Sequence, residues 1–222
     1  MMRTDADIQQ AVLREFKWDT RVDETDVGVE VDSGVVTLTG TVDGWGKRLA
    51  AQEAAHRVIG VLDVANDIQV KVPGTAGRTD TEIARAVRQA LEWDIFVPES
   101  RIRSTVSGGQ VTLEGEVEFW SQRDDAEKAV RNLLGVRHVA NLITIKPPQV
   151  LPSDVRKSIR DALERHADRE AERIDLSVQD GRVSLSGVVH SWTEREAVVG
   201  AARGTPGVRS IDDHLRIRPV AA

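Results

Sequence analysis

The amino-acid sequence repeats three times, with a period of about 75 residues. Gly34, Gly109 and Gly181 are 75 and 72 residues apart. Three further sets keep the same two spacings: Gly40, Gly115 and Gly187; Trp45, Trp120 and Trp192; and Gly60, Gly135 and Gly207. A period of this length is too long for a solenoid repeat and matches a small globular domain. We therefore predict three tandem domains, at residues 1–73, 78–147 and 151–219.

Each unit shows the same order of hydrophobic patterns. An amphipathic helix opens each unit, because apolar residues recur at i, i+4 and i+8. These residues are Ile8, Val12 and Phe16; Ile83, Val87 and Leu91; and Val155, Ile159 and Leu163. A hairpin follows, and a two-residue turn at Ser33-Gly34 would place Val31 opposite Val36 and Val27 opposite Gly40. We predict an α+β fold of three tandem small αββαβ domains, each a three-stranded sheet with two helices packed on one face.

The composition argues against several classes of function. The chain has 222 residues and no Cys, so disulfides and thiol chemistry are excluded. Its net charge is −6, with 8 cations and 13 anions in residues 1–73, 10 and 11 in 74–148, and 12 and 12 in 149–222. Nucleic-acid binding needs a basic face, which this balance does not predict. KH domains share the αββαβ order, but the chain lacks their G-x-x-G loop between helices.

No motif in the sequence indicates catalysis. H-E-x-x-H, G-x-S-x-G, the P-loop and G-x-G-x-x-G are all absent. The five His residues occupy different repeat positions, and a pair of His190 and His214 would supply too few ligands for zinc. We expect a protein that is not an enzyme and has no cofactor and no metal. The N-terminus shows no signal peptide, and no apolar stretch is long enough for a transmembrane segment. These features predict a cytoplasmic location, either free or peripheral at a membrane surface.

A Trp followed three residues later by an Arg recurs where the hairpin gives way to the second helix. These segments, called joints below, are Trp45–Arg48, Trp120–Arg123 and Trp192–Arg195. Thr193 with Glu196 fits a capping box, and Ser121 and Gly46 occupy the position of Thr193 in the other copies. Each Arg would then lie in the first helical turn beside an indole, which suits a phosphate or lipid headgroup. The candidate ligand-binding residues are Trp45, Arg48, Trp120, Arg123, Trp192 and Arg195. In the alternative interpretation, each Trp packs on the first helix or a neighbouring unit, and each Arg pairs with a nearby carboxylate.

Other polar and aromatic residues also recur. Asn66, Asn141 and Asp213 lie on the apolar face of the last strand, where they would satisfy backbone groups of the adjoining loop. Trp18 and Trp93 end the first helix and are expected to cover the core. The predicted N-caps of the first helices are Asp7, Thr81 and Ser153. The first helix of the third unit has a basic flank, either solvated or touching an anionic bilayer, formed by Arg156, Lys157, Arg160 and Arg165.

The ordered set of glycines, helix alanines and final-strand residues resembles the BON domain, a family named for bacterial osmotic-stress and nodulation proteins. The final strands carry runs that begin with Gly-Val: GVLDVAN from Gly60, GVRHVAN from Gly135 and GVRSIDD from Gly207. The resemblance implies a small non-catalytic domain that binds phospholipid or envelope components and acts in osmotic stress. Many members of the family are exported, whereas this sequence shows no export signal.

Two hypotheses for function follow. In the first, a non-enzymatic protein of tandem BON domains associates with anionic phospholipid surfaces in osmotic stress, weakly through each unit and more strongly through several together. In the second, the chain is a protein-interaction scaffold or chaperone-like adaptor without lipid contact. Salt separates them, because headgroup contacts through Arg weaken with ionic strength more than Trp-centred protein contacts. The oligomeric state is left open.

Overall fold

The computed structural model describes residues 3–71, 78–166 and 174–218, without the side chains of 164–166. Three αββαβ units follow one another along the chain, as the sequence predicts. Domain 1 comprises α1 (Asp5–Trp18), β1 (Val27–Asp32), β2 (Val35–Val42), α2 (Trp45–His56), β3 (Asp63–Asn66) and β4 (Gln69–Val70). Domain 2 comprises α3 (Asp80–Trp93), a 3₁₀ turn (Glu99–Arg101), β5 (Ile102–Ser107), β6 (Gln110–Val117), α4 (Trp120–Arg131) and β7 (His138–Ile145). Domain 3 comprises α5 (Pro152–His166), β8 (Ile174–Gln179), β9 (Arg182–Val189), α6 (Trp192–Arg203) and β10 (Ser210–Ile217).

The hairpins have the predicted register. Val31 pairs with Val36 and Val27 pairs with Gly40, so the alternating apolar side chains share one face of the sheet. Ser33 and Gly34 have φ of 51° and 79°, the left-handed conformation that a two-residue type I′ turn requires at both positions. The hairpin's second strand is the middle strand of each sheet, and it pairs in parallel with the last strand. In domain 1 the last strand is interrupted and forms β3 and β4.

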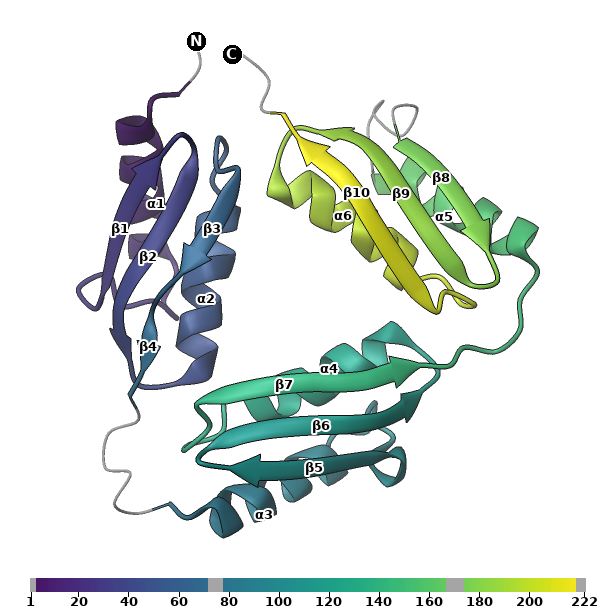
Figure 1. The fold of residues 1–222 in the computed structure, drawn as a ribbon, viewed down its shortest axis with the longest axis horizontal. Helices are drawn as coiled ribbons and strands as arrows, with labels where there is room; N and C mark the ends of the chain where they lie inside the picture. The colour runs from purple at the N-terminus through teal and green to yellow at the C-terminus, as the bar shows by residue number, and fades with distance from the viewer. Residues whose placement is uncertain (1–2, 72–77, 167–173, 219–222) are drawn as a thin grey trace.

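Each domain buries its own apolar core between the sheet and two helices. The apolar stripe of the first helix is buried in all three copies, as at Val12, Val87 and Ile159. Ala51 and Ala54 of α2 are fully buried, because small side chains let the helix lie close to the sheet. Figure 1 shows both helices of each domain behind its sheet. The α+β class and the packing of both helices on one face are therefore confirmed.

The first helices begin at different residues from those predicted. Thr4 and Thr79 are the N-caps of α1 and α3, in place of Asp7 and Thr81. Each Thr accepts a hydrogen bond from the backbone N–H three residues on, and the acidic side chain there accepts one from the Thr backbone. Asp7 is thus the second half of a capping box. Ser153 is not an N-cap, because α5 already begins at Pro152.

The prediction that Trp18 and Trp93 cover the core is wrong. Their side chains are 84% and 77% exposed. Trp18 follows Phe16 by two positions, which turns it about 200° around the helix and away from the apolar stripe. The chain instead returns over the end of the core with Val22 in domain 1 and Val97 in domain 2, both buried. The two indoles therefore lie on the surface at the same repeat position.

The three domains lie at the corners of a triangle (Figure 1). The last strand and the second helix of each domain face the middle of the molecule, while β1, β5 and β8 lie on the outside. The three sheets face one way and the six helices lie on the opposite side. This arrangement brings the beginning of each second helix close to the next domain.

Candidate functional site: the three joints between domains

The second helices begin two residues earlier than predicted. The N-caps are Gly44, Phe119 and Ser191, so each joint Trp is the first residue of its helix. In α6, Ser191 accepts a hydrogen bond of 3.1 Å from the backbone N–H of Glu194. Gly46, Ser121 and Thr193 are therefore not N-caps. Each Arg is the fourth residue of its helix. The unpaired backbone N–H groups of the first turn therefore belong to residues that precede it.

Each joint Arg points back to the last strand of its own domain. In domain 2, Arg123 donates from Nε to the carbonyl of Ile143 at 3.2 Å and from Nη2 to the carbonyl of Asn141 at 3.0 Å. Asn141 in turn donates to the carbonyl of Arg123 at 2.9 Å, and its Oδ1 accepts from the N–H of Ile143 at 3.3 Å. This reciprocal set, called the Arg–Asn clasp below, ties the helix to the strand.

The clasp recurs in domain 1, and an ion pair takes its place in domain 3. In domain 1, Arg48 donates to the carbonyls of Ile68 and Asn66, and Asn66 donates to the carbonyl of Arg48. In domain 3, Asp213 replaces the Asn, and its carboxylate lies 2.8 Å from Nη2 of Arg195. The prediction that the Asn and Asp side chains satisfy backbone groups is confirmed. Folding also accounts for the Arg, because its guanidinium supplies donors to half-buried carbonyls.

Each joint Trp contacts the next domain. Trp45 of domain 1 packs edge-on against His138 of domain 2, with ring centroids 4.5 Å apart. Trp120 of domain 2 donates from Nε1 to the carbonyl of Val208 of domain 3 at 3.2 Å. Trp192 of domain 3 donates to the carbonyl of Leu62 of domain 1 at 3.0 Å. The contacts therefore run from domain 1 to 2, from 2 to 3 and from 3 back to 1.

The surface that receives each Trp is the same in every domain. It is the segment from the end of the second helix to the start of the last strand, called the corner below: residues 56–63, 131–138 and 203–210. The corner begins with His56, Arg131 or Arg203 at equivalent positions. Arg203 lies over Trp120, 5.4 Å from the ring centroid, and His56 stacks on Trp192 at 4.1 Å and 19°. The repeat thus carries a joint and a corner that recognise each other.

The joint Arg and Trp also contact each other within a domain. The guanidinium carbon lies 5.0 Å from the indole centroid at Arg48, 5.6 Å at Arg123 and 4.6 Å at Arg195. These cation–π contacts hold the indole over the guanidinium and orient it toward the neighbouring domain. The clasp therefore positions the Trp, and the Trp makes the contact between domains.

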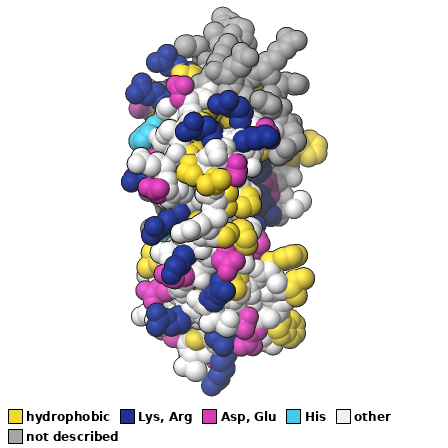
Figure 2. Space-filling view, turned by 90° about the vertical axis from the view of Figure 1, so that its right-hand side faces the viewer, with side chains coloured by type: hydrophobic (Ala, Val, Ile, Leu, Met, Phe, Trp, Pro, Cys, Tyr) yellow, Lys and Arg dark blue, Asp and Glu magenta, His cyan; other side chains and the backbone are white. Residues whose placement is uncertain are grey.

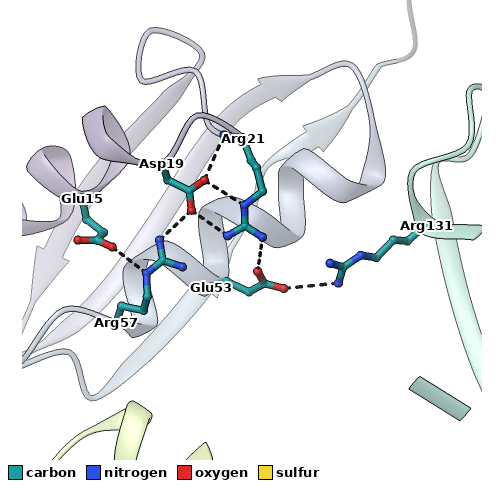
Figure 3. Close-up of polar contacts among 6 residues, drawn as sticks. All are labelled: Glu15, Asp19, Arg21, Glu53, Arg57 and Arg131. Carbon is teal, nitrogen blue, oxygen red and sulfur yellow. Dashed lines mark hydrogen bonds and ion pairs between the residues drawn. The ribbon is translucent and has the colours of Figure 1, made fainter. Parts of the chain in front are cut away.

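The contact between domains 1 and 2 includes an ion pair that sequence reasoning missed. Glu53 of α2 lies 2.9 Å from Arg21 and 3.5 Å from Arg131 of domain 2 (Figure 3). Asp19 accepts hydrogen bonds from Arg21 and Arg57 at the base of this network, and these hold the pKa of its carboxyl well below the usual range. The spacing of Glu53 and Arg131, 78 residues apart, gave no signal for this pair.

Among the three equivalent positions at the start of the corners, one holds a His, His56, and the other two hold an Arg, which stays charged at any physiological pH. Burial lowers the pKa of His56; the nearby Asp63 opposes this, and the positive charge of Arg195 adds to the lowering. Its Nε2 is buried and has no hydrogen-bond partner within the described part of the chain. An imidazolium here would carry a buried donor without an acceptor, which costs free energy. The neutral form therefore suits the contact between domains 3 and 1.

We expect acid to open this contact. The pKa of His56 is lower in the closed molecule than in an open one, where it returns to about 6.5. Protons therefore bind the open form more tightly, and closure weakens as the pH falls below that value. The radius of gyration from X-ray scattering should increase between pH 7.5 and pH 5. His56→Arg copies the other two corners and should remain closed across this range; an unchanged radius in the wild type would contradict the expectation.

The structure places the six predicted ligand-binding residues at three separate sites and does not bring them together. All six side chains are half-buried, each with partners inside the molecule. Headgroup binding by these residues stays a prediction. Within the described residues, no group of three or more His, Asp or Glu side chains could hold a metal ion. Over the same described residues, no helix has the length and hydropathy that a membrane span requires.

Comparisons with known proteins give a family. The model of the BON domain matches three segments, residues 4–72, 79–147 and 153–219. Osmotically-inducible protein Y of Escherichia coli K12 is 31% identical over 131 residues, which make up 56% of this chain and 64% of that protein. An uncharacterized protein in the gshII 5′ region of Anaplasma centrale is 26% identical over 125 residues, 54% of this chain and 83% of that one. The match thus spans less than two thirds of the Escherichia coli protein.

Among solved structures, the C-terminal domain of CdsD is similar at 14% identity. CdsD is a structural protein of the type III secretion system of Chlamydia trachomatis. The comparison covers 98% of this chain and all of that domain, with a TM-score of 0.28. A score this low gives no support for a shared arrangement of the domains.

Proposed function

The chain belongs to the BON domain family, and on this basis we propose that it is a non-enzymatic binding protein that associates with anionic phospholipid surfaces during osmotic stress. The stress context is carried over from the name of the Escherichia coli relative, which this chain matches in part. Exposed side chains on the helix side of the molecule support the lipid partner.

The observation that carries the proposal is the exposure of large apolar residues at the ends of the first helices. Trp18 at the end of α1 is 84% exposed, and Trp93 at the end of α3 is 77% exposed. Ile95 and Phe96 follow Trp93 and are 87% and 68% exposed. An exposed cluster that includes an indole suits the interface between lipid headgroups and acyl chains.

Cations on the same side of the molecule supply the preference for anionic lipid. Arg156, Lys157 and Arg160 are exposed on α5, which lies behind its sheet like α1 and α3. Figure 2 shows hydrophobic side chains along its right-hand edge, the side far from the viewer in Figure 1, and others down the middle of the face. Apolar anchors in domains 1 and 2 would then act with cations in domain 3, so binding would be multivalent.

The joints enter the same proposal in a second role. Trp45, Arg48, Trp120, Arg123, Trp192 and Arg195 would contact headgroups after a joint has left the corner of its neighbour. In the closed molecule each joint indole packs against the neighbouring domain, and each joint guanidinium contacts the last strand of its own domain. We therefore assign the first contact with the membrane to the helix side and a later contact to the joints.

Co-sedimentation with vesicles tests the proposal. Wild-type protein should bind vesicles that contain phosphatidylglycerol and not vesicles of phosphatidylcholine alone, and binding should weaken with salt. Trp93→Ala with Phe96→Ala should reduce binding at least tenfold, because about 150 Å² or more of apolar area per aromatic side chain is lost. Leu142→Ala is the matched control, since Leu142 is 58% exposed on β7 of the same domain. Equal binding by the double variant would refute the helix-side assignment.

A protein-interaction scaffold is the second candidate, and the joints favour it. Each joint and corner forms a Trp-centred contact between two folded domains, the kind of contact that also joins separate proteins. Salt-insensitive capture of a protein partner, together with no vesicle binding by the wild type, would favour this candidate over the lipid proposal.

A further inference from the structure

The contact between domains 3 and 1 closes the triangle and differs from the other two in its place in the chain. The other contacts join domains that follow each other directly. This one joins the last domain to the first, through a hydrogen bond between residues 130 apart. No segment of the chain runs directly between these two domains, so besides the contact itself they are linked through domain 2.

The closing contact is built from few groups. Trp192 stacks on His56, donates to the Leu62 carbonyl and packs against the core cluster of domain 1. The contact between domains 1 and 2 has, besides its Trp, the ion pair of Glu53 and Arg131. Within the described part of the chain, the contact thus centres on one indole, with its stacking partner, its apolar packing and one hydrogen bond, and this is within the range that thermal opening reaches.

Both halves of the closing contact are present on every chain. Domain 3 supplies the joint, and domain 1 supplies a corner that is complementary to it but different from it. An interface of this heterologous kind can close within one chain or continue to another. Between domains 2 and 3, residues 146–151 have no helix or strand, so domain 3 can turn there without breaking a regular element, and the contact of Trp120 with domain 3 opens in the same movement.

We propose that the closing contact is exchangeable: an opened chain docks its domain 3 joint on the domain 1 corner of a second copy of this chain. Trp192 of one copy stacks on His56 of the other, with the same partners as in the closed molecule. Two copies that exchange domain 3 in both directions form a dimer with two such contacts. Within one chain the effective concentration of the two halves is about millimolar, so the exchanged form grows as the protein concentration approaches that value.

Two complementary variants of the full chain isolate the exchanged contact. Trp192→Ala keeps the corner and loses the joint, whereas His56→Ala keeps the joint and loses its stacking partner. Neither variant can form the complete contact with itself, so each alone should be an open monomer with an increased radius of gyration. A mixture at about 1 mM should contain a one-to-one heterodimer, because Trp192 of one variant meets His56 of the other.

Sedimentation equilibrium measures the result without lipid, so it is independent of the vesicle test. Trp18→Ala mixed with His56→Ala is the matched control: Trp18 takes no part in the contacts between domains among the described residues, so its variant keeps the closed contact and should form far less heterodimer than the complementary pair at the same concentration. The heterodimer should dissociate on acidification to pH 5, as the same His56 is used. A mixture that stays monomeric, or either variant dimerising alone to the same extent, would overturn the proposal.

Discussion

Gly115→Ala is expected to destabilise domain 2 by about 3 kcal/mol or more, the largest effect that we predict for a single methyl group in this protein. A Cβ at this position would lie 2.1 Å from the backbone carbonyl oxygen of Arg101. Gly115 also has φ of +148°, which residues with a side chain rarely adopt. Because the obstacle is backbone of the 3₁₀ turn that directly precedes the neighbouring strand β5, the clash cannot be relieved by a change of rotamer.

Urea unfolding followed by circular dichroism measures this effect. Gly108→Ala is the control in the same domain, because a Cβ there would meet nothing within 4 Å, although its φ is +58°. That variant should lose only about 1 kcal/mol, the cost of a left-handed residue. If Gly115→Ala loses no more stability than Gly108→Ala, the backbone around Gly115 moves apart easily. The close approach of Gly115 to the Arg101 carbonyl would then not be required. Gly40 and Gly187 occupy the same repeat position, and Gly40 is equally close to Asp26.

Arg123→Met should destabilise domain 2 by about 2–3 kcal/mol, because the carbonyls of Asn141 and Ile143 lose charged donors while partly buried. Met keeps much of the aliphatic length of the side chain, so the change tests the hydrogen bonds of the clasp. The variant should also loosen Trp120 from domain 3, since the guanidinium no longer orients the indole.

Hydrogen exchange at the N–H groups of β7 and Trp fluorescence together measure both effects. Arg88→Met is the matched control, because Arg88 forms an exposed i,i+4 pair with Glu92 on α3, worth less than about 0.5 kcal/mol. If Arg123→Met and Arg88→Met lower the free energy of unfolding equally, the clasp does not hold the last strand. Arg123 would then be available for another role.

Local patterns predicted most of the fold. The hairpin register of Val27 with Gly40 followed from a period of two and one turn, both of which act within a few residues. The helix stripe of Ile8, Val12 and Phe16 followed from the helical period in the same way. Capping was less predictable, because Thr4 and Asp7 are both good caps and the choice depends on where the chain enters the helix. The exposure of Trp18 follows from its angle on the helix, about 200° from Phe16, and not from its hydrophobicity.

The sequence predicted where the joints lie, while headgroup binding by their residues stays a prediction. The recurrence of Trp and Arg marked the joints, and packing on a neighbouring unit was one of two interpretations. The clasp between Arg123 and Asn141 links residues 18 apart that belong to two separate motifs, so neither motif alone revealed it. The three corners share no sequence motif beyond Gly-Val. His56 stacks on the incoming Trp in one copy, whereas Arg203 lies over the incoming Trp in another.

By itself, the sequence determined three αββαβ units, their strand register and the repeated joint, since each depends on periodicity and turn chemistry within one unit. Only the tertiary structure decided which surface each joint meets. Trp120 and Val208 are 88 residues apart, and Trp192 and Leu62 are 130 apart. Contacts of that span depend on how whole domains fit together, through shape and through single atoms such as the Leu62 carbonyl, and no local pattern encodes them. The closed triangle, and with it the place where a second copy could dock, is a property of the assembled domains.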